Sequence, residues 1–293
     1  MKMETLIEQS RKKEKTPLAR KPDPSDQEHL TNPPLSAPLP QETILSTPNQ
    51  RDEPAMKKAH FVLQKKGGVG KSVTANWLAQ YLLSQGELLE VIDTDPSNAT
   101  LSGFKALKAQ HIQLMEGTVL KESKFDLLMN RVLQEDSSFL IDCGASSFIP
   151  LNNYMIENGV VDMITESGKE VYAHIVIAGE SHLMDTLSGF AEMVEQMPEQ
   201  VRLIVWLNEF FGKIEADGKP FEEMNIYLEN EHRIHAVVGV PKYSELFAAD
   251  IEKMIKSKLT FDEVRQSPEF FIMNKSRVFR VQQEIYRQLK ATL

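Results

Sequence analysis

Short apolar runs and longer amphipathic stretches alternate along the chain from about residue 59 onward. The runs have the length and the near-continuous apolar character of strands that are covered on both faces of a sheet. We expect strands at residues 59–64, 88–93, 111–115, 138–142, 173–178, 201–207 and 235–240. Helical patterns lie between them, as at residues 72–85, which precede Gly86 as a C-terminal cap, and at residues 185–196. The alternation predicts an α/β fold: a doubly wound, mostly parallel sheet in three α/β/α layers.

The first 55 residues differ from the rest in composition. They hold nine of the fifteen prolines and no glycine, and they mix charged residues with few aromatic ones. Such a segment cannot bury enough apolar surface to offset its ordering entropy. We therefore expect a disordered, proline-rich tail over residues 1–55, either a spacer or an arm that docks a partner, and a compact domain over residues 56–293.

Charge and cysteine content exclude several classes of protein. With 33 basic and 42 acidic residues, the chain carries a net charge of −9 and is not a nucleic-acid binder by bulk charge. The single Cys143 can form neither an internal disulfide nor a cysteine zinc site, which fits a reducing, cytoplasmic setting. The polar N-terminus does not look like a secretory signal, and no run approaches 18 apolar residues.

The most informative motif follows the first expected strand. Residues 65–72 read Lys-Lys-Gly-Gly-Val-Gly-Lys-Ser, and a helical pattern follows them. Glycines allow backbone N–H groups to wrap around phosphate oxygens at the start of a helix. Lys71 is placed to reach the β- and γ-phosphates of a nucleotide, and the Ser72 hydroxyl to ligate Mg²⁺. The remaining residues of the expected phosphate loop are Gly67, Gly68, Val69 and Gly70.

The helix that follows this loop has an apolar side. The phosphate loop ends at Ser72, and we expect no contact between the nucleotide and the next residue, Val73. The helical spacing places Val73 on one side of the helix together with Trp77, Leu78, Tyr81 and Leu82. We therefore expect position 73 to pack against the domain as part of that side.

Two later strands end in aspartates. Asp93 and Asp95 stand two residues apart at the end of the second strand, so they share a side while the chain is extended. A solvated strand end is the plain alternative for this pair. Asp142 ends the strand at residues 138–142, and its place after the phosphate loop fits the carboxylate that holds Mg²⁺ directly or through water.

Residues 66–72 resemble the deviant Walker A motif of the ParA/MinD family, whose members are ATPases that dimerise around nucleotide. The resemblance implies that Lys66 reaches across the dimer to the partner's phosphates. It also implies that Asp93 helps to organise the water shell of the metal and that Asp95, in the first switch region, positions the attacking water. Lys65 stands where the general phosphate-loop pattern has glycine, a departure that the family tolerates.

The same resemblance implies a base pocket late in the chain. Asn208 follows the strand at residues 201–207, where the family commonly has an asparagine that can donate to and accept from adenine. Pro241 follows the next strand, in the loop that flanks the base. Asn208 could equally be a turn residue. Trp206 and Trp77 are expected in the core.

Longer stretches resemble a narrower group, the plasmid conjugal transfer proteins of the TraL type. The matching stretches are residues 60–72, 142–151, 185–190, 206–208, 218–221 and 259–263. Together these resemblances imply a P-loop ATPase domain over residues 56–293 that binds ATP and Mg²⁺ and forms a homodimer on ATP. They also imply a role in plasmid transfer or maintenance with another plasmid protein. Two alternatives stay open: a ParA-type partition ATPase that binds DNA, and a recruitment module that holds ATP but hardly hydrolyses it.

Three other features carry weaker expectations. Residues 251–293 hold nine basic and five acidic residues. The plain interpretation is a last helix with a solvated basic face; DNA backbone contact is the alternative, and membrane contact is not expected. Cys143 is expected to be a small apolar neighbour rather than a nucleophile. Four histidines at positions 174, 182, 232 and 235 match no known metal-ligand spacing.

Overall fold

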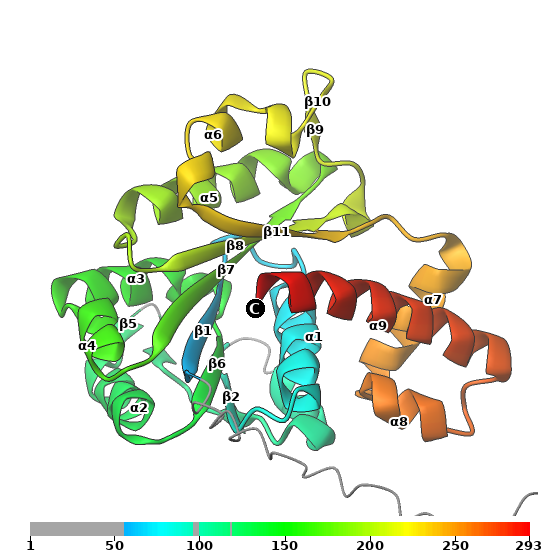
Figure 1. The fold of residues 1–293 in the computed structure, drawn as a ribbon, viewed down its shortest axis with the longest axis horizontal. Coiled ribbons are helices and arrows are strands. Elements are labelled where there is room, and N and C mark those ends of the chain that lie inside the picture. Colours follow the sequence, from blue (N-terminus) through cyan, green and yellow to red (C-terminus); the bar gives the residue numbers. More distant parts are fainter. Residues whose placement is uncertain (1–55, 96–99, 118) are drawn as a thin grey trace, which may run out of the picture. The chain divides into compact units, whose positions relative to one another are not determined.

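Seven parallel strands form one sheet, in a computed structural model that describes residues 56–95, 100–117 and 119–293. Their order is β11-β8-β7-β1-β6-β2-β3, so β1 lies in the middle and the chain crosses over to both sides of it (Figure 1). This order confirms the predicted doubly wound parallel sheet. The strands are β1 (Lys58–Leu63), β2 (Leu89–Asp93), β3 (Gln110–His111), β6 (Ser138–Asp142), β7 (Glu170–Ala178), β8 (Arg202–Asn208) and β11 (Ile234–Val240). The tail expected at residues 1–55 lies outside the described residues.

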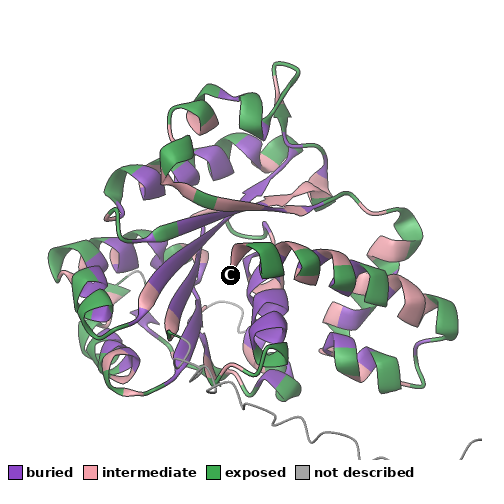
Figure 2. Cartoon of the chain, in the orientation of Figure 1, coloured by how far each residue is buried: buried purple, intermediate pink, exposed green. Residues whose placement is uncertain are grey.

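Helices cover both faces of the sheet (Figure 1). One face packs against α2 (Glu122–Gln134), α3 (Phe148–Glu157), α4 (Val160–Glu166) and α5 (Leu183–Gln196). The other face packs against α1 (Lys71–Ser84), α7 (Glu245–Lys256), α8 (Phe261–Gln266) and α9 (Ile272–Thr292). The central strands are buried on both sides (Figure 2). Double coverage explains why their sequences read as continuous apolar runs rather than as alternating ones.

Short elements connect the main ones. They are β4 (Met115–Glu116), β5 (Val119–Leu120), β9 (Glu215–Ala216), β10 (Lys219–Pro220), α6 (Asn225–Leu228) and the 3₁₀ turns η1 (Leu101–Gly103), η2 (Lys105–Leu107), η3 (Ala145–Ser147), η4 (Glu180–His182), η5 (Glu209–Phe211), η6 (Phe221–Glu223) and η7 (Glu231–Arg233). The prediction of one strand at residues 111–115 was wrong. Residues 110–111 extend the main sheet as an exposed edge, whereas Met115 turns away to pair with β5 and bury its side chain.

The helix after the phosphate loop, α1, is more deeply enclosed than its pattern predicts. Gly86 follows α1 with φ of +79°, which confirms it as the capping residue. The predicted apolar side is buried at Trp77, Leu78, Tyr81 and Leu82, and the burial extends around the helix to every residue from Thr74 to Leu82, between the sheet, η1 and α9. Val73, at the start of the helix, is half-buried and packs against the same core.

The last helix, α9, follows its pattern more closely. Its predicted apolar side is buried as expected, with Val278, Val281, Ile285 and Leu289. This helix is the longest of the described part of the chain, at 21 residues. Among the described residues, no helix is long and apolar enough to cross a membrane.

Candidate functional site

A tight loop joins β1 to α1 at the carboxyl edge of the sheet. Gly68 and Gly70 have φ of +76° and +101°, conformations that residues with side chains rarely adopt. A Cβ atom on Gly70 would also lie 2.6 Å from the Asn208 Nδ2 atom. Gly70 directly precedes α1, whose first N–H groups have no partner within the helix. The loop therefore presents the backbone donors and the positive helix end that bind phosphate.

Lys71 brings a buried positive charge to this loop. It is the first residue of α1 and is only 7% exposed. Its Nζ atom donates a hydrogen bond of 3.0 Å to the carbonyl oxygen of Lys66, so the side chain bends back over the loop. Burial lowers the pKa of Lys71, while the nearby carboxylates of Asp142 and Asp95 raise it. An ammonium group in this position would gain from an anionic ligand that offsets its desolvation.

Asp142 is the most unusual group in the site. Both of its carboxylate oxygens are buried and have no hydrogen-bond partner of normal geometry among the described residues. Burial raises the pKa of Asp142 to about 7; the adjacent Ser72 hydroxyl and the charge of Lys71 oppose this, and Asp93 and Asp95 add to it. A buried carboxylate whose polar neighbours are one hydroxyl and one ammonium group is costly unless a cation or its water shell occupies the other side.

The residues around Asp142 fit a magnesium site. Mg²⁺ is usually held by one or two protein oxygens together with water and substrate phosphates. Ser72 and Asp142 supply such oxygens beside the phosphate loop. Across the described part of the chain, no three acidic, histidine or cysteine side chains gather as a metal cage. Two protein oxygens beside a phosphate loop, Ser72 Oγ and the Asp142 carboxylate, suit a cation that arrives with a nucleotide.

Asp93 and Asp95 lie beside Asp142, as their strands predict. Asp93 stands opposite Asp142 in the register of β2 and β6. Its Oδ1 atom accepts from the backbone N–H of Asp95 at 3.2 Å, and its Oδ2 atom accepts from that of Ser102 at 2.9 Å. Asp93 thus holds the backbone at Asp95 and at Ser102 together. Asp95 itself lies close enough to influence the pKa of Lys71 and of Asp142.

The two lysines at the start of the loop turn toward α5. Lys66 Nζ forms an ion pair of 2.6 Å with Asp185 Oδ2, and this contact holds the pKa of Asp185 below its usual value. Lys65 Nζ donates to Ser188 Oγ at 2.9 Å and pairs with Glu192. Sequence reasoning did not single out these three partners on α5, because polar residues on an exposed helix face are ordinary.

Asn208 contacts the phosphate loop. Its Nδ2 atom donates to the Val69 carbonyl at 2.9 Å, and its Oδ1 atom accepts from the Phe210 N–H at 3.2 Å. Asn208 is therefore a turn residue, the alternative that the sequence left open. A carboxamide has two N–H donors and two acceptor positions, so one of each remains for a ligand.

An apolar cavity of about 320 Å³ opens beside the loop. Gly68, Gly70 and Asn208 lie at one side, and its walls come from α1, η5, Tyr243 and α7. Its size and its position next to a phosphate loop suit a nucleotide base. The lining aromatic residues are Trp77, Phe210, Phe211 and Tyr243.

Two predicted positions lie differently around this cavity. Val73 lines the cavity one helical turn before Trp77. The sequence predicted no nucleotide contact for this residue. Its side chain adds to the apolar wall and brings no polar group. Pro241, which was predicted to flank the base, is exposed and lines a separate hollow with Leu207 and Phe221.

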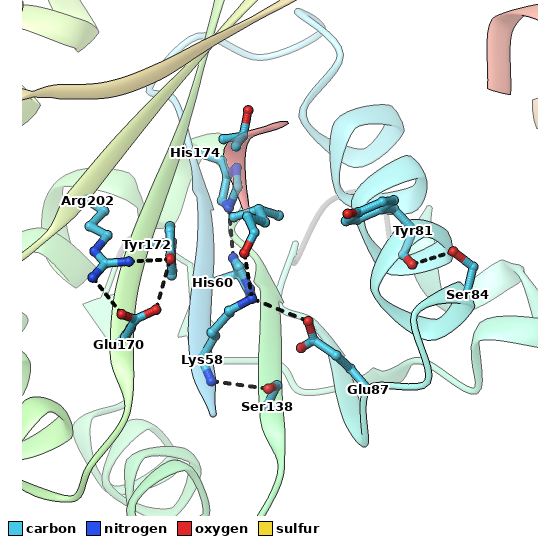
Figure 3. Close-up of polar contacts among 12 residues, drawn as sticks. Lys58, His60, Tyr81, Ser84, Glu87, Ser138, Glu170, Tyr172, His174 and Arg202 are labelled. Carbon is cyan, nitrogen blue, oxygen red and sulfur yellow. Dashed lines mark hydrogen bonds and ion pairs between the residues drawn. The ribbon is translucent and has the colours of Figure 1, made fainter. Parts of the chain in front are cut away.

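Two buried histidines, His60 on β1 and His174 on β7, lie side by side on neighbouring strands of the sheet (Figure 3). His174 Nδ1 accepts from the Trp206 indole N–H at 3.1 Å, and His174 Nε2 lies 2.9 Å from His60 Nδ1. Since indole can only donate, His174 carries its proton on Nε2 and donates to His60. Burial lowers the pKa of His174 to about 3 and that of His60 well below its usual value. This neutral pair holds β1, β7 and β8 together.

The predicted basic face of α9 is partly neutralised by acidic neighbours. Arg277 forms a largely buried ion pair of 2.5 Å with Asp250, and Arg287 pairs with Glu284 at 2.7 Å. Cys143 is buried as expected, and burial raises the pKa of its thiol. Neither feature adds to the chemistry at the loop.

Comparison with known proteins assigns the sequence to a family. The sequence profile of the CobQ/CobB/MinD/ParA nucleotide binding domain matches residues 60–290. Two proteins named TraL from Escherichia coli are each 39% identical to the chain; one aligns over 237 residues, 80% of this chain and 98% of that protein. Two solved structures are similar. The MinC:MinD cell division protein complex from Aquifex aeolicus is 16% identical, has a TM-score of 0.45 and covers 80% of this chain and 96% of that chain. MinD complexed with Mg-ADP from Pyrococcus horikoshii is 17% identical and has a TM-score of 0.43. The alignment covers 81% of this chain and 99% of that chain.

Proposed function

The chain belongs to the CobQ/CobB/MinD/ParA family of nucleotide-binding proteins, and from this premise we propose that it is a Mg²⁺-dependent ATPase that switches between a monomer and an ATP-bound dimer. The observation that carries the proposal is the buried carboxylate of Asp142, which has no hydrogen-bond partner of normal geometry among the described residues and lies beside Ser72 and the buried Lys71. Such a group stays charged at neutral pH at little cost only when a cation stands against it.

Each residue of the site has a role in this proposal. Gly67, Gly68, Val69 and Gly70 wrap the phosphates with backbone N–H groups, and Lys71 stabilises the charge that develops on the γ-phosphate. Ser72 and Asp142 would hold Mg²⁺, which supplies charge neutralisation at the phosphates when bound. Asp95 orients the attacking water. Asp93, with both oxygens on the backbone near Asp95, acts by holding that backbone in place.

Dimerisation is proposed for the carboxyl edge of the sheet. Lys66 is held there by an exposed partner, Asp185, from which it can be released toward a second copy. Exposed apolar side chains stand on the segments that follow three strands of the sheet: Ile149 at 57%, Met184 at 72% and Phe210 at 55%. Single exposed apolar residues are common, but three around one phosphate loop favour a contact surface. Lys66 would then complete the partner's site.

The process is proposed to be plasmid transfer or maintenance, acting with another plasmid protein. This rests on the 39% identity with TraL over nearly the whole length of that protein. DNA binding through α9 is less favoured, because Arg277 and Arg287 are engaged in ion pairs with Asp250 and Glu284. A partition-type ATPase would bind DNA in an ATP-dependent and strongly salt-dependent way.

Nucleotide binding can be followed through Trp77. The chain has two tryptophans; Trp77 lines the cavity, whereas Trp206 is fully buried in the core. Mg-ATP is expected to change the tryptophan emission saturably in the wild-type chain. Trp77→Phe should lose this change and, because phenylalanine keeps an aromatic ring in the cavity wall, bind Mg-ATP within about threefold of the wild type by calorimetry. Calorimetry that detects no Mg-ATP binding by the wild-type chain would reject the proposed function.

A further inference from the structure

Lys258 follows α7 in a conformation that normally belongs to glycine. Its φ is +55°, in the left-handed region. The Lys258 N–H donates to the Ile255 carbonyl and the Leu259 N–H to the Met254 carbonyl, both at 3.1 Å. These two bonds form a Schellman motif, in which the left-handed position favours glycine.

Two other helices of the domain end in the same motif with glycine. At the end of α1, Gly86 donates to Leu83 and Glu87 donates to Leu82, and Gly86 has φ of +79°. At the end of α4, Gly168 has φ of +86° with the equivalent pair of bonds. The lysine at the end of α7 therefore departs from the residue that local conformation prefers. Lysine at this position therefore carries a backbone strain that glycine would avoid.

The Lys258 side chain lies along the segment at residues 100–104. Its Nζ atom donates to the Thr100 carbonyl at 3.2 Å and stands 5.2 Å from the centre of the Phe104 ring. Its aliphatic stem packs on Gly103, where a Cβ would come within 3.1 Å of it. A carbonyl, an aromatic ring and a close glycine together fix the position of this segment.

The same segment is tied to the catalytic aspartates. Ser102, between the residues that Lys258 contacts, donates its N–H to Asp93 Oδ2, and Asp93 Oδ1 accepts from the N–H of Asp95. Lys258 also follows α7, whose residues Ile251 and Ile255 line the apolar cavity. A continuous set of contacts thus runs from the cavity wall through Lys258 to Asp95.

We propose that Lys258 is a positioning residue that fixes the backbone around Asp95 and ties it to the helix that walls the nucleotide cavity. The inference rests on the proposed ATPase function. Lys258 contacts Thr100, Gly103 and Phe104 and would act through Ser102 and Asp93 on the position of the Asp95 carboxylate, not by contact with the nucleotide. Loss of its side chain should therefore affect the chemical step rather than nucleotide affinity.

The test is Lys258→Gly in the full chain, with Lys108→Gly as the matched control. Lys108 is a second left-handed lysine, with φ of +51°, that is exposed at the end of η2. Because glycine suits the capping position, the thermal midpoint of Lys258→Gly should stay near that of the wild type. Its kcat should fall about tenfold with KM for Mg-ATP within about twofold, since a small misplacement of a catalytic group costs about that much or more. Lys108→Gly should keep the wild-type kcat, and Lys258→Arg should recover part of the loss.

A second readout does not depend on turnover. Hydrogen exchange of the Ser102 amide, measured by NMR or mass spectrometry, should be about tenfold faster in Lys258→Gly and unchanged in Lys108→Gly. If the wild-type chain does not hydrolyse ATP, the proposed function fails. The exchange rate of the Ser102 amide still tests whether Lys258 holds the segment at residues 100–104 in place. Unchanged kcat together with unchanged Ser102 exchange would overturn the inference. So would a rise in KM with kcat unaltered, because Lys258 would then serve binding instead.

Discussion

Replacement of Lys71 by alanine is expected to lower ATP turnover by about three orders of magnitude. The ammonium group lies beside Asp142 and Asp95 at the start of α1, where the γ-phosphate would be placed. Removing one preorganised donor to a developing negative charge costs about 10²–10³-fold in kcat, and Lys71 also supplies binding energy to the phosphates. Phosphate release under saturating Mg-ATP measures the effect directly.

The control for this loss is a lysine outside the site. Lys213 is highly exposed, so Lys213→Ala should retain wild-type turnover. Nucleotide-free Lys71→Ala should still unfold in one cooperative transition, with a lower thermal midpoint because the positive charge beside Asp142 is lost. Turnover of Lys71→Ala within threefold of the wild type would show that hydrolysis takes place elsewhere or in a contaminant.

Asp142→Asn is expected to stabilise the nucleotide-free chain at alkaline pH. Burial raises the folded-state pKa of Asp142 from 3.8 to about 7. Between about pH 4 and pH 7 the folded chain therefore holds a proton that the unfolded chain has released, so the wild-type carboxyl costs progressively more stability as pH rises. Above about pH 7 the cost reaches a few kcal/mol, or about 5–10 °C in thermal midpoint. A neutral amide avoids this cost.

Thermal unfolding without nucleotide at pH 5 and pH 8 tests this sign. The difference between Asp142→Asn and the wild type should be about two- to threefold smaller at pH 5 than at pH 8. Asp136, whose side chain is 94% exposed, provides a control, and Asp136→Asn should show no such trend. The same Asp142→Asn chain should lose Mg²⁺-dependent turnover. An Asp142→Asn variant that is less stable than the wild type at pH 8 would mean that the carboxylate is compensated in the folded state.

The sequence predicted the sheet better than it predicted its coverage. Six strands coincide with their apolar runs because both faces of the sheet are buried, so burial itself determines the pattern. The prediction of one strand at residues 111–115 was wrong because these residues are divided between two sheets. His111 pairs with β2 at the edge of the main sheet, whereas Met115 pairs with β5 in a hairpin. The pattern of α1 indicated its apolar side but not that its polar residues Thr74, Asn76 and Gln80 would also be buried, because a helix enclosed by a sheet and other helices needs no polar face.

The site was predictable where one motif fixes both backbone and chemistry. Lys71, Ser72, Asp93, Asp95 and Asp142 converge because parallel strands bring their carboxyl ends to one edge. The contacts that hold these residues were not predictable. Asp185 on α5 contacts the loop and Lys258 after α7 contacts the segment at residues 100–104, and neither contact follows from a motif in the sequence. Pro241 was predicted to flank the base only from the family resemblance. Its position after β11 does not determine which hollow it lines, and it lies beside Leu207 and Phe221 instead.

The central claim, an ATP-dependent dimer, is tested most directly by sedimentation velocity of the full chain. With Mg²⁺ and a non-hydrolysable ATP analogue at saturation, the wild type should sediment as a dimer, and with Mg-ADP as a monomer. Lys66→Ala should stay monomeric with the analogue while the Trp77 emission still reports nucleotide binding. Identical sedimentation of the wild type with the analogue and with ADP, both bound, would contradict the account.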